Sequence, residues 1–228
     1  SIVGLLGPNG SGKSTLMRIL SGLIISWDGD IYLEGDSIRG SNTMLKRSGF
    51  LIEDPSFYEY LTAQQNLTMF SRLTNTDPVE IKKVLKKVDL LNEKDKKVSE
   101  YSYGMKQRLG IAQAILHDPD ILFFDEPNNG LDPNGISTMN QTMDNLNKEG
   151  KTIFISTHIL EHVKELCTHV IVLRDGKLVL DESMEDLIKN EDRYIIKLNN
   201  TQIAIDKLKL HSAIKVVDSN EKKIIVKS

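Results

Sequence analysis

The sequence has one cysteine, no long apolar run and no excess of charge of either sign. Because Cys167 is alone, a disulfide within the chain is excluded, and the thiol fits a reducing compartment. No uninterrupted apolar run approaches the roughly 20 residues that span a bilayer as a helix. With 29 basic and 32 acidic residues, the formal net charge of -3 gives no general attraction to nucleic acid.

The length of 228 residues and the 39% share of hydrophobic residues allow one large α/β core, or a core with a small appendage. Apolar segments at residues 2–6, 121–124 and 152–156 are typical of strands buried on both faces of a parallel sheet. Each segment is followed by polar residues. Since ligands gather at the carboxyl ends of parallel strands, we expect these three strand ends to meet in space.

The character of the sequence changes between the first two predicted strands and again near the end. Residues 24–50 are typical of short antiparallel strands and turns packed beside the core. Thr62 can cap one helix and Asp77-Pro78 can open another, which predicts a helical subdomain at residues 57–117. From residue 190 onward, the pattern indicates a strand, an amphipathic helix to residue 210 and a hairpin. We therefore predict a main domain of residues 1–189 and a small C-terminal α+β appendage of residues 190–228.

A glycine-rich segment lies between the first predicted strand and a helical pattern. It fits the phosphate-loop pattern G-x-x-x-x-G-K-S/T with Gly7, Pro8, Asn9, Gly10, Ser11, Gly12, Lys13 and Ser14. Its glycines let backbone N–H groups point at a phosphate chain, and the following helix adds partial positive charge. Lys13 then reaches the β and γ phosphates, the Ser14 hydroxyl suits Mg²⁺, and Thr15 can donate to a neighbouring phosphate. The alternative is a simple glycine-rich turn.

Two carboxylates follow the second predicted strand directly, and a histidine follows the third. Asp125 would hold the magnesium shell, and Glu126 would polarise the water that attacks the γ phosphate. From the end of the third strand, the imidazole of His158 can donate to the γ phosphate and keep the water and Glu126 aligned. Taken alone, an Asp-Glu pair after a strand is a common cap or turn, and a single histidine is usually structural.

His158 also begins the sequence His158-Ile159-Leu160-Glu161-His162, which fits the zinc-protease pattern H-x-x-E-H. On a helix, both histidines could face one metal ion. A protease, however, leaves the phosphate loop and Asp125-Glu126 unexplained. We prefer the nucleotide interpretation, which uses His158 and leaves His162 as an ordinary helix residue.

The segment Tyr101-Ser102-Tyr103-Gly104-Met105-Lys106-Gln107-Arg108 resembles the L-S-G-G-Q signature of ATP-binding cassette (ABC) proteins. Residues 129–132 resemble the D-loop of that family, and His158 stands where its switch histidine is expected. The resemblance implies an α/β fold of the P-loop NTPase type, with a mostly parallel core sheet and an ABC-type helical subdomain. It also implies a head-to-tail dimer with a second ATP-binding subunit, in which Ser102 and Gly104 touch the γ phosphate held by the partner.

Three departures from the general ABC pattern concern the signature, the Q-loop and the start of the chain. Tyr103 replaces the first signature glycine. A tyrosine is strained at positive φ, and its side chain fills space beside the phosphate. The substitution therefore predicts slow hydrolysis or local rearrangement at the partner's site. Glu53 replaces the usual Q-loop glutamine and joins Ser14 and Asp125 as a predicted magnesium ligand. Both substitutions resemble the bacitracin-resistance and lantibiotic-immunity branch of exporters. The chain also begins at the phosphate-loop strand, and Tyr32 is a candidate for the family's adenine-stacking aromatic residue.

By resemblance, the chain is the ATP-hydrolysing subunit of an ABC exporter, with ATP and Mg²⁺ as cofactors and antimicrobial peptide export or immunity as its role. It would drive a separate polytopic membrane permease from the cytoplasm, at the inner face of the cell membrane. The aromatic residues within 57–61 would face that permease or pack on the helical subdomain. Two alternatives stay open: a soluble ABC ATPase of translation or repair, without a pore, and a regulatory module with slow turnover.

Overall fold

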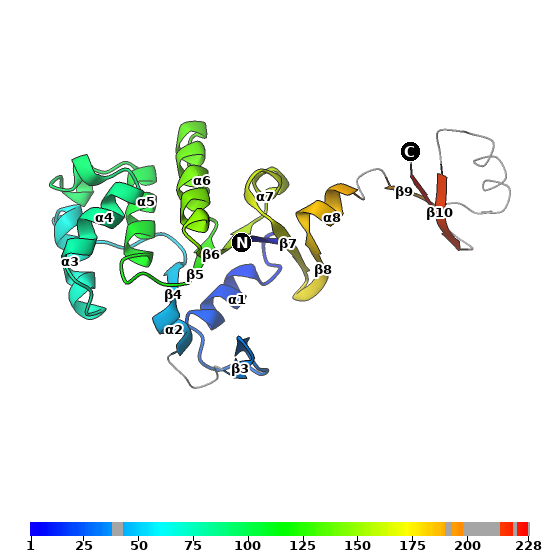
Figure 1. Ribbon diagram of the computed structural model, residues 1–228, viewed down its shortest axis with the longest axis horizontal. Coiled ribbons are helices and arrows are strands. Elements are labelled where there is room, and N and C mark those ends of the chain that lie inside the picture. The colour runs from blue at the N-terminus through cyan, green and yellow to red at the C-terminus, as the bar shows by residue number, and fades with distance from the viewer. Residues whose placement is uncertain (38–42, 190–192, 198–214, 221–222, 228) are drawn as a thin grey trace. The chain divides into compact units, whose positions relative to one another are not determined.

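The computed structural model describes residues 1–37, 43–189, 193–197, 215–220 and 223–227 (Figure 1). Backbone contacts divide the chain into two compact units, Ser1–Asp181 and Glu182–Ser228. This division lies before helix α8 (Met184–Lys189), whereas the sequence placed the domain boundary after residue 189. Across the described residues, no helix combines the length and the apolar character that crossing a membrane requires.

Six strands form the central sheet, and five of them pair in parallel. Their order is β4 (Ser48–Leu51), β5 (Ile121–Asp125), β6 (Thr152–Thr157), β1 (Ile2–Leu6), β7 (His169–Arg174) and β8 (Lys177–Ser183). The register aligns Asp125 with Ser156 and Leu6 with Thr157, so the carboxyl ends of β1, β5 and β6 lie together. The predicted parallel sheet and the predicted meeting of three strand ends are confirmed.

Strand β4 corrects one expectation. The sequence predicts short antiparallel strands and turns within residues 24–50, and this is wrong for the end of that range, because β4 pairs in parallel with β5. The antiparallel part is limited to β2 (Tyr32–Leu33) and β3 (Asp36–Ser37). Strand β4 also packs closely on helix α5 (Tyr103–Ala114), because a Cβ atom at Gly49 would lie 2.1 Å from the carbonyl oxygen of Ala114.

The predicted helical subdomain consists of α3 (Ala63–Leu73), α4 (Val79–Lys87) and α5, which lie together in Figure 1. Thr62 and Gln65 form a capping box at the start of α3, with bonds of 2.9 and 3.1 Å. The Asp77 carboxylate accepts a 2.9 Å hydrogen bond from the N–H of Val79 and fixes the start of α4. Both predicted helix starts are confirmed. The short 3-10 helices η1 (Leu91–Glu93) and η2 (Val98–Glu100) connect α4 to α5.

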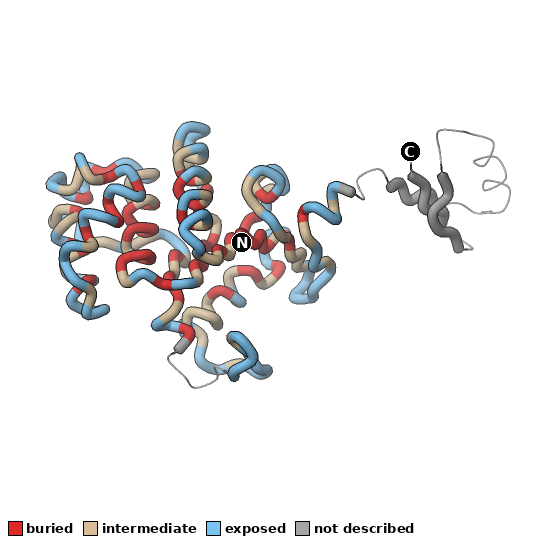
Figure 2. The backbone as a smooth tube through the Cα atoms, viewed as in Figure 1, coloured by how far each residue is buried: buried red, intermediate tan, exposed pale blue. Residues whose placement is uncertain are grey.

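The other helices of the first unit are α1 (Lys13–Leu20), α2 (Thr43–Arg47), α6 (Pro133–Lys148) and α7 (Leu160–Leu166). Asp132 caps α6 by accepting a 2.8 Å hydrogen bond from the N–H of Gly135. The buried residues in Figure 2 follow the strands and the helix faces turned toward them. Two clusters of buried apolar residues therefore support the elements that carry polar strand ends.

The second unit contains α8 and an antiparallel three-stranded sheet. Its order is β10 (Lys215–Asn220), β11 (Lys223–Lys227) and β9 (Arg193–Lys197). The predicted strand and hairpin of the appendage are present. The predicted amphipathic helix up to residue 210 lies outside the described residues.

Candidate active site

The phosphate loop connects β1 to α1, as the sequence predicts. Gly10 and Gly12 have φ angles of 80° and 104°, a region in which a side chain would be strained. The turn between β7 and β8 supports this loop, because the N–H of Gly176 donates a 3.1 Å hydrogen bond to the carbonyl of Ser11. A Cβ atom at Gly7 would lie 2.3 Å from the carbonyl oxygen of Leu173, so the loop lies directly against this hairpin.

Two buried polar groups make the inside of the loop suited to an anion. The Ser11 hydroxyl is buried and has no hydrogen-bond partner within the described part of the chain. Lys13 is only 5% exposed; its ammonium donates to the carbonyls of Gly7 at 2.8 Å and Pro8 at 3.2 Å. The Glu126 carboxylate is 3.9 Å away, at the limit of an ion pair. Because a buried cation attracts an anion more strongly than an exposed one, a phosphate group would be well compensated here.

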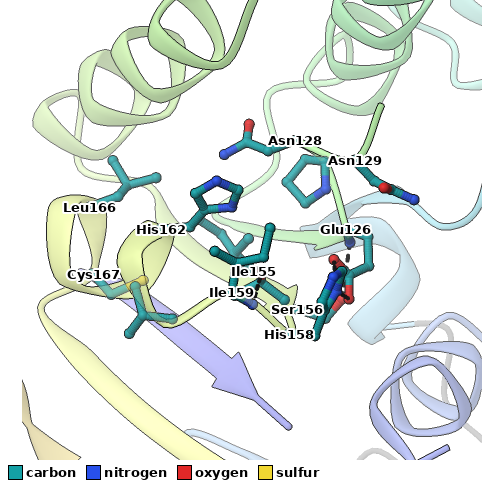
Figure 3. Close-up of a pocket in the computed structure, with 13 residues that line it drawn as sticks. Glu126, Asn128, Asn129, Ile155, Ser156, His158, Ile159, His162, Leu166 and Cys167 are labelled. Atoms are coloured by element: carbon teal, nitrogen blue, oxygen red, sulfur yellow. Dashed lines mark hydrogen bonds and ion pairs between the residues drawn. The ribbon is translucent and has the colours of Figure 1, made fainter. Parts of the chain in front are cut away.

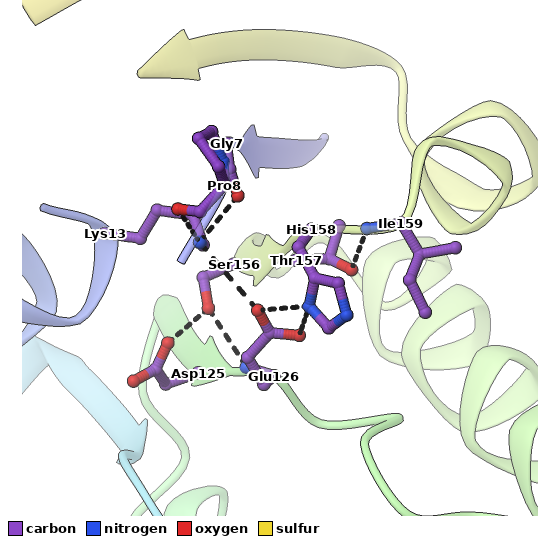
Figure 4. Close-up of polar contacts among 9 residues, drawn as sticks. All are labelled: Gly7, Pro8, Lys13, Asp125, Glu126, Ser156, Thr157, His158 and Ile159. Atoms are coloured by element: carbon purple, nitrogen blue, oxygen red, sulfur yellow. Dashed lines mark hydrogen bonds and ion pairs between the residues drawn. The ribbon is translucent and has the colours of Figure 1, made fainter. Parts of the chain in front are cut away.

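The predicted carboxylates stand at the end of β5, and Ser156 of β6 connects them (Figure 4). The Ser156 hydroxyl donates to the Asp125 carboxylate and accepts a 3.0 Å hydrogen bond from the N–H of Glu126. Ser156 is fully buried, and sequence reasoning missed it. The sequence offers one signal for Ser156, a hydroxyl near the end of a mostly apolar strand. Its alignment with Asp125 appears only when the two strands are paired.

Glu126 and His158 form the pair that the sequence predicted. The Nδ1 atom of His158 lies 3.0 and 3.2 Å from the two carboxylate oxygens of Glu126 (Figure 4). The backbone of Glu126 has a φ of 49°, in the left-handed region, where non-glycine residues are uncommon. Such a conformation is held only by surrounding contacts and is frequent at functional sites. Lys13, Asp125, Glu126 and His158 are therefore brought together at one edge of the sheet.

A pocket flanks this pair on the side of α7 (Figure 3). Its lining comes from the ends of β5 and β6 and from α7: Glu126, Pro127, Asn128, Asn129, Ile155, Ser156, Thr157, His158, Ile159, His162, Val163, Leu166 and Cys167. His158 precedes α7, whereas His162 lies within it, so the H-x-x-E-H pattern does not occupy one helix. Burial raises the pKa of the Cys167 thiol to about 12, so the thiol stays protonated at neutral pH.

Three predicted binding residues lie outside the cluster around Lys13. Glu53 follows β4 and forms an ion pair with Arg18 in the last turn of α1. Ser102 caps α5 by accepting a 3.3 Å hydrogen bond from the N–H of Met105. A Cβ atom at Gly104 would lie 3.3 Å from the side chain of Leu131. Ser102 and Gly104 line an open groove between the start of α5 and residues 130–138.

Tyr103 needs no strained backbone, so the backbone reason given for slow hydrolysis is wrong, whereas slow hydrolysis itself stays a prediction. It is the first residue of α5 and is absent from the described residues that have positive φ. The signature position is therefore helical in this chain, and a side chain is accommodated there. Any effect of Tyr103 on turnover must come from its side-chain contacts.

The oxygen donors of the site fit a magnesium ion. Ser14 lies in the first turn of α1, next to Lys13, and Asp125 ends the neighbouring β5. Hydroxyl and carboxylate oxygens are hard ligands of the kind that Mg²⁺ prefers, and the buried ammonium of Lys13 next to Ser14 would compensate the charge of a phosphate.

Comparison with known proteins assigns the family. The ABC transporter family matches residues 1–129, from the phosphate loop through the helical subdomain to the carboxylates at the end of β5. The chain belongs to the ABC transporter family. The bacitracin transport ATP-binding protein BcrA of Bacillus licheniformis is 42% identical over 85% of this chain and 64% of its own length. The lantibiotic transport ATP-binding protein SrtF of Streptococcus pyogenes is 38% identical over 83% of this chain and 85% of its own length.

Solved structures agree with this assignment. A solved structure of the ATP binding subunit of an ABC transporter has a TM-score of 0.71 and 28% identity, over 83% of this chain and 81% of its own length. The structure of cbiO1 from Clostridium perfringens has a TM-score of 0.74 and 26% identity, over 92% and 84%. The predicted fold class and the predicted resemblance to the bacitracin and lantibiotic branch are confirmed. The chain spans 64% of the length of BcrA, so it matches only part of that relative.

Proposed function

We propose that this chain binds ATP with Mg²⁺ and hydrolyses it, as the motor subunit of an ABC exporter. The observation that carries the proposal is the joining of Lys13, Asp125, Glu126 and His158 through Ser156 and the phosphate loop. A buried ammonium compensates phosphate charge, and a carboxylate with an imidazole beside it can orient the attacking water, which are needs of phosphoryl transfer to water.

Each residue has a defined task in this proposal. The backbone N–H groups of residues 8–12, the Ser11 hydroxyl and Lys13 bind the phosphates, and displacement of the Lys13 bonds to Gly7 and Pro8 frees its ammonium for them. Glu126 accepts the proton of the attacking water, and His158 holds the carboxylate of Glu126 in place. Ser14, Asp125 and Glu53 are the candidate metal-binding residues, and bound Mg²⁺ would compensate the charge of the phosphate oxygens.

A head-to-tail dimer completes the site in this proposal. The groove that includes Ser102 and Gly104 lies at the N-terminus of the 12-residue helix α5, which favours a negatively charged ligand. Because this chain's own phosphate loop is on another element, the groove is suited to a nucleotide held by a second ATP-binding subunit. ATP would then join two subunits, and hydrolysis would separate them.

The membrane partner is proposed to be a separate polytopic permease, contacted from the cytoplasmic side. Tyr58 and Tyr60 are 49% and 69% exposed, and their ring centroids lie 5.9 Å apart in an edge-to-face arrangement, whereas Phe57 is partly buried against the larger hydrophobic cluster. The two exposed tyrosines offer an apolar surface with polar tips for such a partner. The names of BcrA and SrtF support export of, or immunity to, an antimicrobial peptide.

The experiment is an ATP-binding and phosphate-release assay on the chain and two variants. Lys13→Ala should weaken ATP binding by about 30-fold or more, because it removes a charge-assisted contact from a buried site. Glu126→Gln should keep ATP binding and lower hydrolysis by about 100-fold or more.

The exposed residues Lys82 and Glu161 provide matched controls, as Lys82→Ala and Glu161→Gln. Both control variants should behave as the unchanged chain does. Normal hydrolysis by Glu126→Gln would refute its role as the base, and absence of ATP binding by the unchanged chain would refute the whole proposal.

A further inference from the structure

The side chain of Tyr103 joins three segments around the proposed nucleotide site. Its hydroxyl donates a 2.7 Å hydrogen bond to the carboxylate of Asp54 and accepts a 2.8 Å hydrogen bond from the side-chain amide of Gln107. Burial, reinforced by the bond to Asp54, raises the pKa of Tyr103, so the phenol keeps its proton and remains a donor at neutral pH. The bond therefore connects the start of α5 to the loop that follows β4.

The ring of Tyr103 makes the third contact. A Cβ atom placed on Gly130 would lie 3.1 Å from the ring edge of Tyr103, and Gly130 has a φ of 72°. Residue 130 belongs to the loop that follows β5 and the carboxylate Glu126. One side chain thus contacts the segments after two neighbouring parallel strands, and its hydroxyl and its ring contribute separately.

Two consecutive residues of the loop after β4 are held by two different helices. Arg18 of α1 pairs with Glu53, and Tyr103 of α5 binds Asp54. Glu53 and Asp54 are exposed, and Glu53 has a φ of 63° in the left-handed region. Because neither side chain is packed in the core, these polar contacts determine where the two carboxylates stand. Helix α1 also carries Lys13 and Ser14, so the loop connects the phosphate-binding helix to α5.

We propose that Tyr103 is a positioning residue that, through Asp54, sets the location of Glu53 and thereby the affinity of the site for Mg²⁺. The proposal rests on the proposed function, in which Glu53 is a candidate metal-binding residue. The hydroxyl of Tyr103 is the group that makes this connection, because it forms the hydrogen bond to Asp54. A glycine at this place would lack the connection.

The experiment compares Tyr103→Phe, Asp54→Ala and the double variant with the unchanged chain. Tyr103→Phe keeps the ring against Gly130 and removes only the hydroxyl. Tyr101→Phe is the matched control, because the Tyr101 hydroxyl donates a 2.8 Å hydrogen bond to the carbonyl of Glu93, away from the loop after β4. Two quantities are measured: the Mg²⁺ concentration that gives half-maximal phosphate release, and the ratio of ATP dissociation constants in EDTA and in Mg²⁺.

The expected result is a rise of about 3- to 10-fold in the half-maximal Mg²⁺ concentration for Tyr103→Phe. This is less than a buried hydrogen bond to a carboxylate would give, because Asp54 is exposed. The ratio of dissociation constants should fall by a similar factor, whereas ATP affinity in EDTA should not change. Asp54→Ala should have the same effect, and the double variant should add nothing to it. Tyr101→Phe should lower thermal stability and leave Mg²⁺ dependence unchanged.

Two outcomes would overturn the inference. One is an unchanged Mg²⁺ dependence in Tyr103→Phe, with or without a loss of thermal stability. The other is additive effects of Tyr103→Phe and Asp54→Ala, which would mean that the two residues act independently. Either result in a chain that binds and hydrolyses ATP leaves the proposed function intact, whereas an unchanged chain that does not bind ATP refutes the proposed function itself.

Discussion

Replacing Ser156 by alanine tests whether the two carboxylates at the end of β5 depend on a hydroxyl from β6. The Ser156 hydroxyl is fully buried, donates to the Asp125 carboxylate and accepts from the N–H of Glu126. Ser156→Ala removes both bonds and changes little volume. The N–H of Glu126 keeps a 3.2 Å hydrogen bond to the backbone carbonyl of residue 156. The substitution therefore affects the carboxylate of Asp125 more, because it removes a hydrogen bond that this carboxylate accepts.

The magnitude follows from the charge of the acceptor. A hydrogen bond to a charged group contributes about 1.5–3 kcal/mol to stability, and the second bond contributes less because the N–H of Glu126 retains a partner. We expect Ser156→Ala to lower the free energy of unfolding by about 2–3 kcal/mol. Phosphate release should fall at least about tenfold, because Asp125 and the strained backbone of Glu126 lose a shared support.

Ser48 of the neighbouring strand β4 provides the matched control. It is 1% exposed, and its hydroxyl contacts only the sulfur of Met44, at 3.5 Å, among the described residues. A sulfur is a weak acceptor, so Ser48→Ala should change the free energy of unfolding by less than about 1 kcal/mol. Urea unfolding of both variants gives the comparison. Equal losses, together with normal phosphate release by Ser156→Ala, would refute the reasoning.

Two further predictions concern packing and pH. Gly49→Ala should lower the free energy of unfolding by about 3 kcal/mol or more, because the new Cβ atom would lie 2.1 Å from the backbone oxygen of Ala114. An unchanged midpoint of urea unfolding would contradict the close packing of β4 on α5. The pKa of Cys167 in the folded chain is about 12, above the ordinary value of 9.0. As pH rises from about 9 toward 12, the unfolded chain therefore loses this proton before the folded chain does, and the free energy of unfolding falls. Cys167→Ala should remove up to about 1.4 kcal/mol per pH unit from the fall of the unfolding free energy with pH. Equal pH dependence of the two chains in urea titrations at pH 8 to 10 would refute the raised pKa of this partly buried thiol.

Local sequence patterns predicted the parts of the site that depend on one segment of chain. The phosphate loop needs glycines and a lysine at fixed spacing, and Asp125, Glu126 and His158 follow apolar runs, so each was found from neighbours in the sequence. The caps at Thr62 and Asp132 act over three residues; the first was predicted for the same reason.

The parts that depend on pairing between distant segments could not be predicted. Ser156 becomes important only when β5 and β6 are in register, and Arg18 meets Glu53 only after α1 packs near the end of β4. Strand β4 was assigned to the wrong kind of pairing, because four residues carry too weak a pattern to distinguish a parallel strand from an antiparallel one. Tyr103 was expected to strain the backbone, and the helical start of α5 removes that strain.

The hairpin turn between β7 and β8 makes the shape of the phosphate loop depend on residues far from the glycine-rich motif. Gly176 and Leu173 support the phosphate loop from a strand pair near the other end of the first unit. A substitution at this turn would act as a phosphate-loop mutation although it leaves every residue of the glycine-rich motif unchanged. Likewise, a shortened chain that ends before Leu173 would keep the motif and lose the backbone that supports it.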